Sequence, residues 1–252
     1  MNKCLTAILL ALSATASAQR LQPAPRLVVN ITIDQLRTDY IQAFAPLYGP
    51  DGFKKLLSEG RVYEAASYDF LPIDRASAVA SISSGTTPYY NNIVSSQWLD
   101  RATLRPVYCV ADSKVGTSPR LLSTSTIGDE LKVATGGSAL VYALAFSRDA
   151  AVLSAGHAAD GAVWVDDNRG VLATSAYYPQ KTHKWLNAYN AVYSQRASDD
   201  RTKNLAIAHA AQACVVEQAM GRDAVTDYLA VTLSAKGRGA ANWQTDMEGV
   251  YI

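Results

Sequence analysis

The 252-residue sequence predicts an α/β protein with a largely parallel central sheet. Segments typical of strands alternate with segments typical of helices along the chain. Several strand segments are apolar throughout instead of alternating, which is the pattern of strands covered on both faces. Polar side chains follow where such strands end, and ligands of parallel sheets usually bind at that edge.

Residues 1–18 have the three-part pattern of a secretory signal peptide. Lys3 precedes an apolar run over residues 5–12, and an Ala-Ser-Ala sequence ends at Ala18, after which we expect cleavage. No later stretch reaches the ~18 apolar residues that a membrane span requires. We therefore expect a periplasmic or secreted protein without a membrane span.

The composition indicates a packed core and argues against some partners. Apolar residues make up 49% of the chain and charged residues 18%, which is typical of a folded domain. A formal net charge of +1 favours no nucleic-acid partner. Cys109 and Cys214 lie far apart and in no C-x-x-C pattern, so we expect separate buried thiols, with a disulfide as the alternative that export would permit.

A Pro-containing linker over residues 19–25 leads into one domain over residues 26–252. The domain begins with a β-branched strand at 26–34, and a helical stretch ends in a glycine at 52–60. A second strand is expected at 61–71, where a proline closes it.

Two hairpins and a capped helix are expected in the middle of the chain. Residues 97–110 and 162–175 are typical of hairpins that turn at Asp100–Thr103 and Asn168–Gly170. Residues 126–135 predict a short helix whose first threonine serves as the N-cap, with two acidic residues near its start.

The remaining segments complete the alternation of strands and helices. Residues 139–146 and 227–234 are apolar and rich in strand formers, so we expect two more buried strands there. Helices are expected at 183–194 and 201–220, and a glycine stops the second of them.

The stretch PIDRASAVASISSG, residues 72–85, predicts a corner that leads into a helix ending at Gly85. A corner of this kind often holds a catalytic hydroxyl or grips a phosphate on the backbone N–H groups of the helix N-terminus. Arg75 stands where such a nucleophile is expected. Its guanidinium could bind an anion, or it could be an exposed side chain paired only with Asp74.

Several phrases together resemble one family. In order along the chain they are LVVNITIDQLRTDY, SISSGTTP, WLDRATLRPVYCVADS, TIGDEL and LSAGHAADGAVWVDDNRGVLATSAYY. The chain from residue 26 to 252 resembles the N-terminal half of the alkaline phosphatase superfamily. It is most similar to the periplasmic alkaline phosphatases and the type I phosphodiesterase/nucleotide pyrophosphatase group. The resemblance implies an alkaline-phosphatase-like sandwich that is truncated at its C-terminus.

The resemblance also implies a chemistry. In this family two zinc ions clamp the phosphoryl group, and a threonine or serine at a helix N-terminus is transiently phosphorylated. Each zinc needs about three protein ligands from Asp and His. Asp34 fits the family's first zinc aspartate and is the only matching metal ligand, with further ligands implied beyond Ile252.

At the catalytic positions the sequence departs from the family pattern. The nucleophile position, three residues after Pro72, holds Arg75, and Ser77 is a weak alternative two positions further on. The family's phosphate-binding asparagine falls near Ser96. Its Lys-x-Arg pair falls on residues 147–149, which read Ser-Arg-Asp, so that Arg148 is the remaining cation.

The second metal segment of the family is replaced as well. Where the family reads Asp-Tyr-x-x-Gly-His, this chain reads SAKGRGAANW, with Lys236 and Arg238 near the position of a carboxylate. No histidine occurs after His209. His157 has Asp160 three residues on, but we expect a hydrogen-bonded structural histidine there rather than a metal ligand.

Two functions remain open from the sequence. The first is an exported pseudoenzyme with a binding or scaffold role, in which Asp34 and Arg75, with Lys236 or Arg238 as further candidates, replace metal charge by protein charge. Its ligand would be a phosphate ester or another anion held by Arg75, Ser96 and Arg148. The alternative is a zinc-dependent phosphatase or phosphodiesterase. Zinc is the expected cofactor only if the protein is active.

Overall fold

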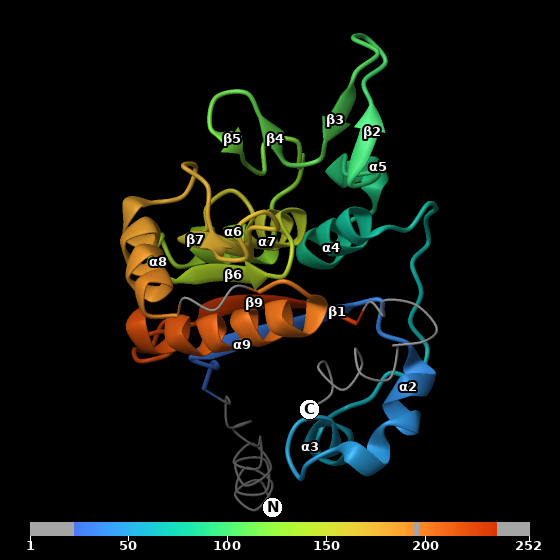
Figure 1. The fold of residues 1–252 in the computed structure, drawn as a ribbon, viewed down its shortest axis with the longest axis vertical. Coiled ribbons are helices and arrows are strands. Elements are labelled where there is room, and N and C mark those ends of the chain that lie inside the picture. The colour runs from blue at the N-terminus through green and yellow to red at the C-terminus, as the bar shows by residue number, and fades with distance from the viewer. Residues whose placement is uncertain (1–22, 194–196, 236–252) are drawn as a thin grey trace, which may run out of the picture.

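The computed structural model describes residues 23–193 and 197–235 and contains a five-stranded sheet in the order β1-β9-β6-β7-β8 (Figure 1). Its strands are β1 (Leu27–Asp34), β9 (Asp227–Ser234), β6 (Val141–Ala145), β7 (Gly161–Val165) and β8 (Leu172–Ala173). The first four are parallel, and β8 is an antiparallel edge strand. The predicted α/β class with a mostly parallel sheet is confirmed.

The register of the sheet places the end of β1 beside the end of β9. These strands pair over their full length, from Leu27 opposite Asp227 to Asp34 opposite Ser234. The central strand β6 is buried along its whole length, because helices cover both of its faces. Asp34 therefore lies at the carboxyl edge of the sheet, the edge where parallel sheets usually bind ligands.

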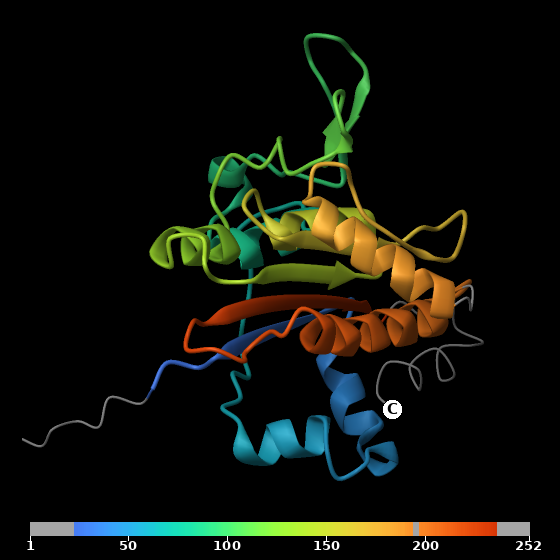
Figure 2. The same ribbon diagram turned by 90° about the vertical axis from the view of Figure 1, so that its left-hand side faces the viewer.

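Helices cover the two faces of the sheet (Figures 1 and 2). On one face lie α4 (Arg75–Ser84), α6 (Ile127–Ala134) and α7 (Arg148–Ala155); on the other lie α8 (Gln180–Val192) and α9 (Asp200–Glu217). Alternate residues of β6 show the division, since Ala143 belongs to the first core and Leu144 to the second.

Smaller elements complete the fold. They are α2 (Thr38–Ala43), η1 (Ala45–Leu47), α3 (Phe53–Glu59), α5 (Pro88–Asn91), β2 (Gln97–Leu99), β3 (Pro106–Tyr108), β4 (Ala111–Asp112) and β5 (Gly116–Thr117). Both predicted hairpins are confirmed, as β2–β3 and β7–β8. Among the described residues no helix has the length and apolarity that crossing a bilayer demands.

The strand predicted at residues 61–71 is wrong. The structure has irregular backbone there, and every side chain of the segment is exposed except the half-buried Phe70. The segment pairs with none of the described strands, so β-branched and aromatic residues alone do not make it a strand. Helix α7 was not predicted from the sequence.

The predicted N-cap of α6 is confirmed, and the aspartate of its capping box also contacts a histidine. The Thr126 hydroxyl accepts the N–H of Asp129, and the Asp129 carboxylate accepts the N–H of Thr126. His157 lies against the same carboxylate, with its Nδ1 3.1 Å from Asp129 Oδ2 and its Nε2 3.1 Å from the Leu122 carbonyl. The partner of His157 is thus Asp129, and both ring nitrogens face oxygen acceptors.

Both cysteines are free and buried, in different cores. Cys109 belongs to the core beside α4 and α7, and Cys214 belongs to the core beneath α9. Separate buried thiols were the favoured expectation from their spacing, and the structure bears it out.

Candidate functional site

A cleft of about 600 Å³ opens at the carboxyl end of β1. Its walls come from the end of β1, the loop that follows it, the start of α4 and the residue before β2. They are lined by Thr32, Ile33, Asp34, Gln35, Leu36, Tyr68, Ile73, Asp74, Arg75, Ala78, Val79, Ile82 and Ser96. The cleft therefore brings together three of the predicted site residues, Asp34, Arg75 and Ser96.

A capping box fixes the N-terminus of α4 in one wall. The Asp74 carboxylate accepts the backbone N–H of Ser77 at 2.9 Å, and the Ser77 hydroxyl accepts the backbone N–H of Asp74 at 3.0 Å. The other oxygen of Asp74 accepts the Ser95 hydroxyl at 2.8 Å and the Ser96 N–H at 2.6 Å. Burial alone would raise the pKa of Asp74, but these hydrogen bonds outweigh it and hold the pKa below its ordinary value. Asp74 thus stabilises the helix start and does not pair with Arg75.

Arg75 is the first residue of α4, and its guanidinium binds Asp149 in a two-pronged arrangement. Its Nη2 lies 2.9 Å from Asp149 Oδ2 and its Nε lies 3.2 Å from both carboxylate oxygens. The Asp149 side chain is 0% exposed, whereas 30% of the Arg75 side chain is exposed. The guanidinium also lies 5.3 Å from the centre of the Phe146 ring. The geometry is that of a strong charge-assisted pair with one partner fully buried.

Asp34 lies on the other side of the same guanidinium. Its Oδ2 is 4.0 Å from Arg75 Nη1, which is an ion pair but too long for a hydrogen bond. That oxygen is buried and has no hydrogen-bond partner among the described residues. Desolvation raises the pKa of Asp34, and the nearby Arg75 offsets only part of this effect. Asp34 is therefore a less readily ionised carboxyl group than an exposed aspartate.

The zinc ions implied by the family resemblance do not fit this arrangement. Zinc needs about three protein ligands, whereas the described residues contain no group of three His, Cys, Asp or Glu side chains placed to hold a metal. Asp34 and Asp149 instead flank a fixed cation, Arg75.

The other predicted site residues have different places. The Ser77 side chain is 0% exposed, and its hydroxyl is used in the capping box. Ser96 lies in the cleft, where its hydroxyl donates to Asp149 at 3.3 Å. Arg148 is exposed, and its guanidinium lies 4.7 Å from the centre of the Tyr108 ring. Lys236 and Arg238 lie outside the described residues.

Asp149 is the residue that the sequence analysis missed. It takes hydrogen bonds from both Arg75 and Ser96, so it joins two of the predicted residues. A signal was present, because the family resemblance places Asp149 where the arginine of the Lys-x-Arg pair is expected. An acid at that position, together with a base at position 75, could have indicated an ion pair between the two.

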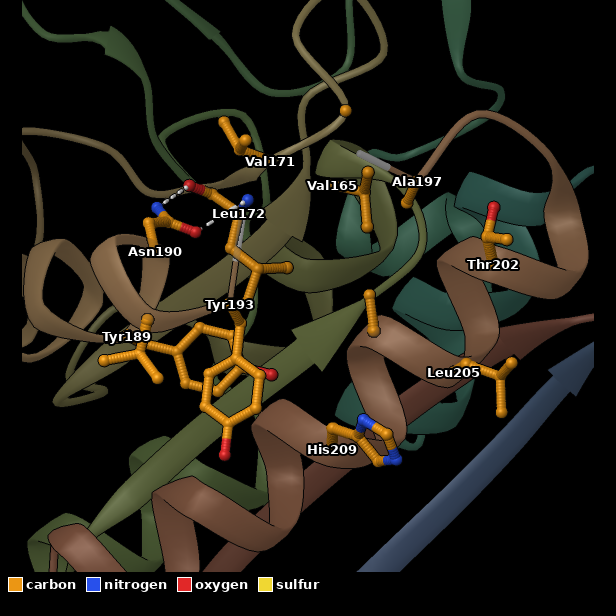
Figure 3. Close-up of a pocket in the computed structure, with 13 residues that line it drawn as sticks. Val165, Val171, Leu172, Tyr189, Asn190, Tyr193, Ala197, Thr202, Leu205 and His209 are labelled. Carbon is orange, nitrogen blue, oxygen red and sulfur yellow. Dashed lines mark hydrogen bonds between the residues drawn. The ribbon is translucent and has the colours of Figure 1, made fainter. Parts of the chain in front are cut away.

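A second hollow, of about 370 Å³, lies between the β7–β8 hairpin and helices α8 and α9 (Figure 3). Its walls are largely apolar, and the Tyr193 ring stacks on Tyr189 with centroids 4.5 Å apart. The Asn190 side chain donates to the Leu172 carbonyl at 2.8 Å and accepts its N–H at 3.3 Å. None of the predicted site residues lines this hollow.

Comparison with known proteins identifies relatives that share this fold. The chain is 37% identical over 177 residues to alkaline phosphatase PhoV of Synechococcus elongatus, covering 66% of this chain and 32% of PhoV. It is 35% identical over 179 residues to alkaline phosphatase PafA of Elizabethkingia meningoseptica, covering 67% of this chain and 33% of PafA. The chain thus spans about a third of the length of these curated relatives.

A solved structure and a family model extend the match. The crystal structure of wild-type alkaline phosphatase PafA superposes with a TM-score of 0.82 at 26% identity, covering 91% of this chain and 57% of that one. The model of the type I phosphodiesterase / nucleotide pyrophosphatase family matches residues 28–238. The resemblance drawn from the sequence is confirmed, and this chain belongs to the type I phosphodiesterase / nucleotide pyrophosphatase family.

Proposed function

We propose that this protein is an exported, catalytically impaired member of the family with a binding or scaffold role. The observation that carries the proposal is the bidentate pairing of Arg75, at the family's nucleophile position, with the fully buried Asp149. A guanidinium stays protonated under all conditions in which proteins fold, so it cannot act as the attacking group. In this proposal Arg75 supplies a fixed positive charge where the family uses metal ions.

The hydroxyl groups near Arg75 support the same proposal. Ser77 is the nearest serine along α4, but its hydroxyl is buried and already accepts and donates within the capping box. The Ser96 hydroxyl donates to Asp149, an acceptor that Arg75 also holds. The one carboxylate that accepts from Ser96 is neutralised by Arg75, and the Ser77 hydroxyl donates to a backbone carbonyl, so among the described residues neither serine has a free base that would activate it as a nucleophile.

An anionic ligand, such as a phosphate ester, is the ligand class we propose for the cleft if it binds a small molecule. The first turn of α4, Arg75 and Ser96 would form its site, with Arg148 as an exposed cation nearby. Arg75 and Ser96 already bind Asp149, so an anion must compete with this carboxylate. A scaffold role therefore has more support than tight phosphate capture.

The alternative function is a zinc-dependent phosphatase or phosphodiesterase that acts through a phosphorylated hydroxyl. Membership of the family and the names of the relatives, which are alkaline phosphatases, favour it. It would require metal ligands and a nucleophile other than those found in the described part of the cleft.

The two functions are separated by measuring zinc and turnover on the purified full-length chain. We expect less than stoichiometric zinc by mass spectrometry and no hydrolysis of p-nitrophenyl phosphate or bis(p-nitrophenyl) phosphate. PafA, purified in the same way, serves as the active control. Tight stoichiometric zinc, with turnover that Asp34→Ala abolishes, would establish the enzyme and overturn our proposal.

A further inference from the structure

The second hollow, between the β7–β8 hairpin and helices α8 and α9, is separate from the cleft at the end of β1. The two share no lining residue. The volume of the hollow, about 370 Å³, exceeds the ~300 Å³ at which small-molecule sites begin. An apolar cavity of ~150 Å³ already holds a benzene ring. The second hollow therefore has room for a molecule of two fused rings.

Hydrogen bonds to the hairpin hold the walls of the hollow in place. The side chain of Asn190, on α8, binds both the carbonyl and the N–H of Leu172 (Figure 3). On the chain that leads into α9, the Ala197 N–H donates to the Gly170 carbonyl at 2.8 Å. These polar groups are satisfied within the protein, so they fix the spacing of the walls rather than wait for a ligand. The hollow is thus formed in advance, as most small-molecule sites are.

A pair of tyrosine rings forms one wall of the hollow. Tyr189 and Tyr193 lie four positions apart and stack, with centroids 4.5 Å apart and an angle of 23° between the ring planes. Tyr189 is 8% exposed, whereas the outer residue, Tyr193, is 54% exposed. The outer ring therefore keeps accessible π-surface. A flat aromatic group can extend such a stack, and aromatic pairs contribute more than the area they bury.

Another wall comes from one face of α9 and carries no permanent charge. Thr202, Leu205, Ala206 and His209 line it at the spacing of a single helix face. The Thr202 hydroxyl is used in the N-cap of α9, whereas the His209 ring has no hydrogen-bond partner among the described residues. None of the described lining residues is Asp, Glu, Lys or Arg. The hollow thus offers an imidazole for hydrogen bonding but no side chain that would balance an ionised ligand.

We propose that the second hollow binds a small, neutral, planar aromatic molecule that carries one hydrogen-bonding group. Its rings stack on Tyr193 and contact the buried Val165 and Leu172, and its polar group bonds to the His209 imidazole. An ionised ligand is disfavoured, because the apolar walls would remove water from its charge without compensation. An aliphatic ligand would fill the same space but would gain no stacking energy.

The probe for this site is 2-naphthol, which is planar, neutral at pH 7 and carries one hydroxyl. Its fluorescence anisotropy, titrated with the 252-residue chain, should rise to saturation. Two matched competitors test the chemistry. 1-Decanol has the same number of carbons and one hydroxyl but no rings, and 2-naphthoate has the same rings and a charge. Each should bind at least ~10-fold more weakly than 2-naphthol.

Variants at exposed positions locate the bound probe without disturbing the core. Leu205→Glu, at a 46% exposed position of the α9 wall, should weaken binding more than ~10-fold, whereas Val216→Glu, 62% exposed on the same helix but outside the hollow, should leave it unchanged. Tyr193→Ala should weaken binding ~10-fold, and Tyr193→Phe, which keeps the ring, should retain it. His209→Ala should weaken binding ~5-fold. Circular dichroism checks that each variant is folded.

Four results would overturn the proposal. The first is the absence of saturable 2-naphthol binding to the folded chain. The second is binding that Leu205→Glu and Tyr193→Ala leave unchanged, which would place the probe elsewhere. The third is 1-decanol or 2-naphthoate binding as tightly as 2-naphthol. The fourth is a dimer that sedimentation detects and Leu205→Glu dissociates, because this would assign the hollow to a second copy of the chain.

Discussion

Replacing Arg75 with alanine should destabilise the fold far more than replacing an ordinary surface arginine. The change removes all three hydrogen bonds that the guanidinium donates to Asp149. Asp149 would then keep its own-helix contact with the Ala150 N–H at 3.0 Å and the weaker contact with the Ser96 hydroxyl at 3.3 Å. A carboxylate that is 0% exposed would thus lose its only cationic hydrogen-bond partner among the described residues.

The size of the effect follows from the burial of the two partners. Breaking a fully buried ion pair by removing one partner costs about 3–5 kcal/mol, because the remaining charge is left uncompensated. Since 30% of the Arg75 side chain is exposed, part of its interaction is screened, and we expect a loss of about 2–4 kcal/mol in the free energy of unfolding. That is a large share of the ~5–15 kcal/mol that stabilises most domains.

Urea unfolding at pH 7, followed by circular dichroism, measures this loss. Arg169→Ala is the matched control, because Arg169 pairs with Asp166 across an exposed turn and is itself 68% exposed. The control should change the free energy of unfolding by less than about 0.5 kcal/mol. The double variant Arg75→Ala/Asp149→Ala should be more stable than the sum of the single losses predicts, since neither charge is then left alone.

Two results would refute this reasoning. One is an Arg75→Ala variant that is as stable as the Arg169→Ala control. The other is strict additivity of the losses caused by Arg75→Ala and Asp149→Ala, since additivity would show that the two side chains are not coupled.

Three further predictions follow from the described contacts. The hydrogen bond to Asp129 raises the pKa of His157 above its ordinary value of 6.5, so the pair should stabilise the fold fully below pH 6.5. This stabilisation should be lost as pH rises through the folded-state pKa of His157. In urea unfolding between pH 5 and 8, His157→Ala should therefore reduce the fall of the unfolding free energy with pH. Burial raises the pKa of the Cys109 thiol, and it raises the pKa of the Cys214 thiol to about 12. Neither thiol should therefore react with a disulfide reagent until the protein unfolds. Ser77→Ala removes the hydroxyl of the α4 capping box and should cost about 1 kcal/mol of unfolding free energy, measured in urea; an unchanged free energy of unfolding would contradict this capping role.

Sequence patterns predicted the elements whose local sequence is itself typical of a strand or of a capped helix. The central strands are continuous apolar runs, and Thr126 is a typical N-cap residue of a helix. Both features could be predicted from the local sequence alone, without knowing which elements pack beside them. Residues 61–71 share the composition of a strand but find no partner strand in the described sheet. Helix α7 is eight residues long and buried at every position from Asp149 to Ala155, so it lacks the polar face that marks a surface helix.

The candidate site was predictable only where one residue could be compared with a family position. Asp34 and Arg75 stood out in that way, and the structure brings them to 4.0 Å. The contact of Arg75 with Asp149 joins residues 74 positions apart in the chain, and no local sequence pattern predicts a contact over that separation. The fold had to bring the starts of α4 and α7 together before the principal partner of Arg75 could be seen.

The charges at positions 75 and 149 are energetically favourable only when both are present. The family pattern implies a hydroxyl at the first position and an arginine at the second, so Arg75 alone would bring two guanidinium groups together. An aspartate alone at position 149 would leave a fully buried carboxylate without a cation, which is costly. With both changes, the buried carboxylate and the guanidinium satisfy each other. Restoring a hydroxyl with Arg75→Thr would leave Asp149 unpaired, so this single reversal should weaken the fold and produce no phosphatase.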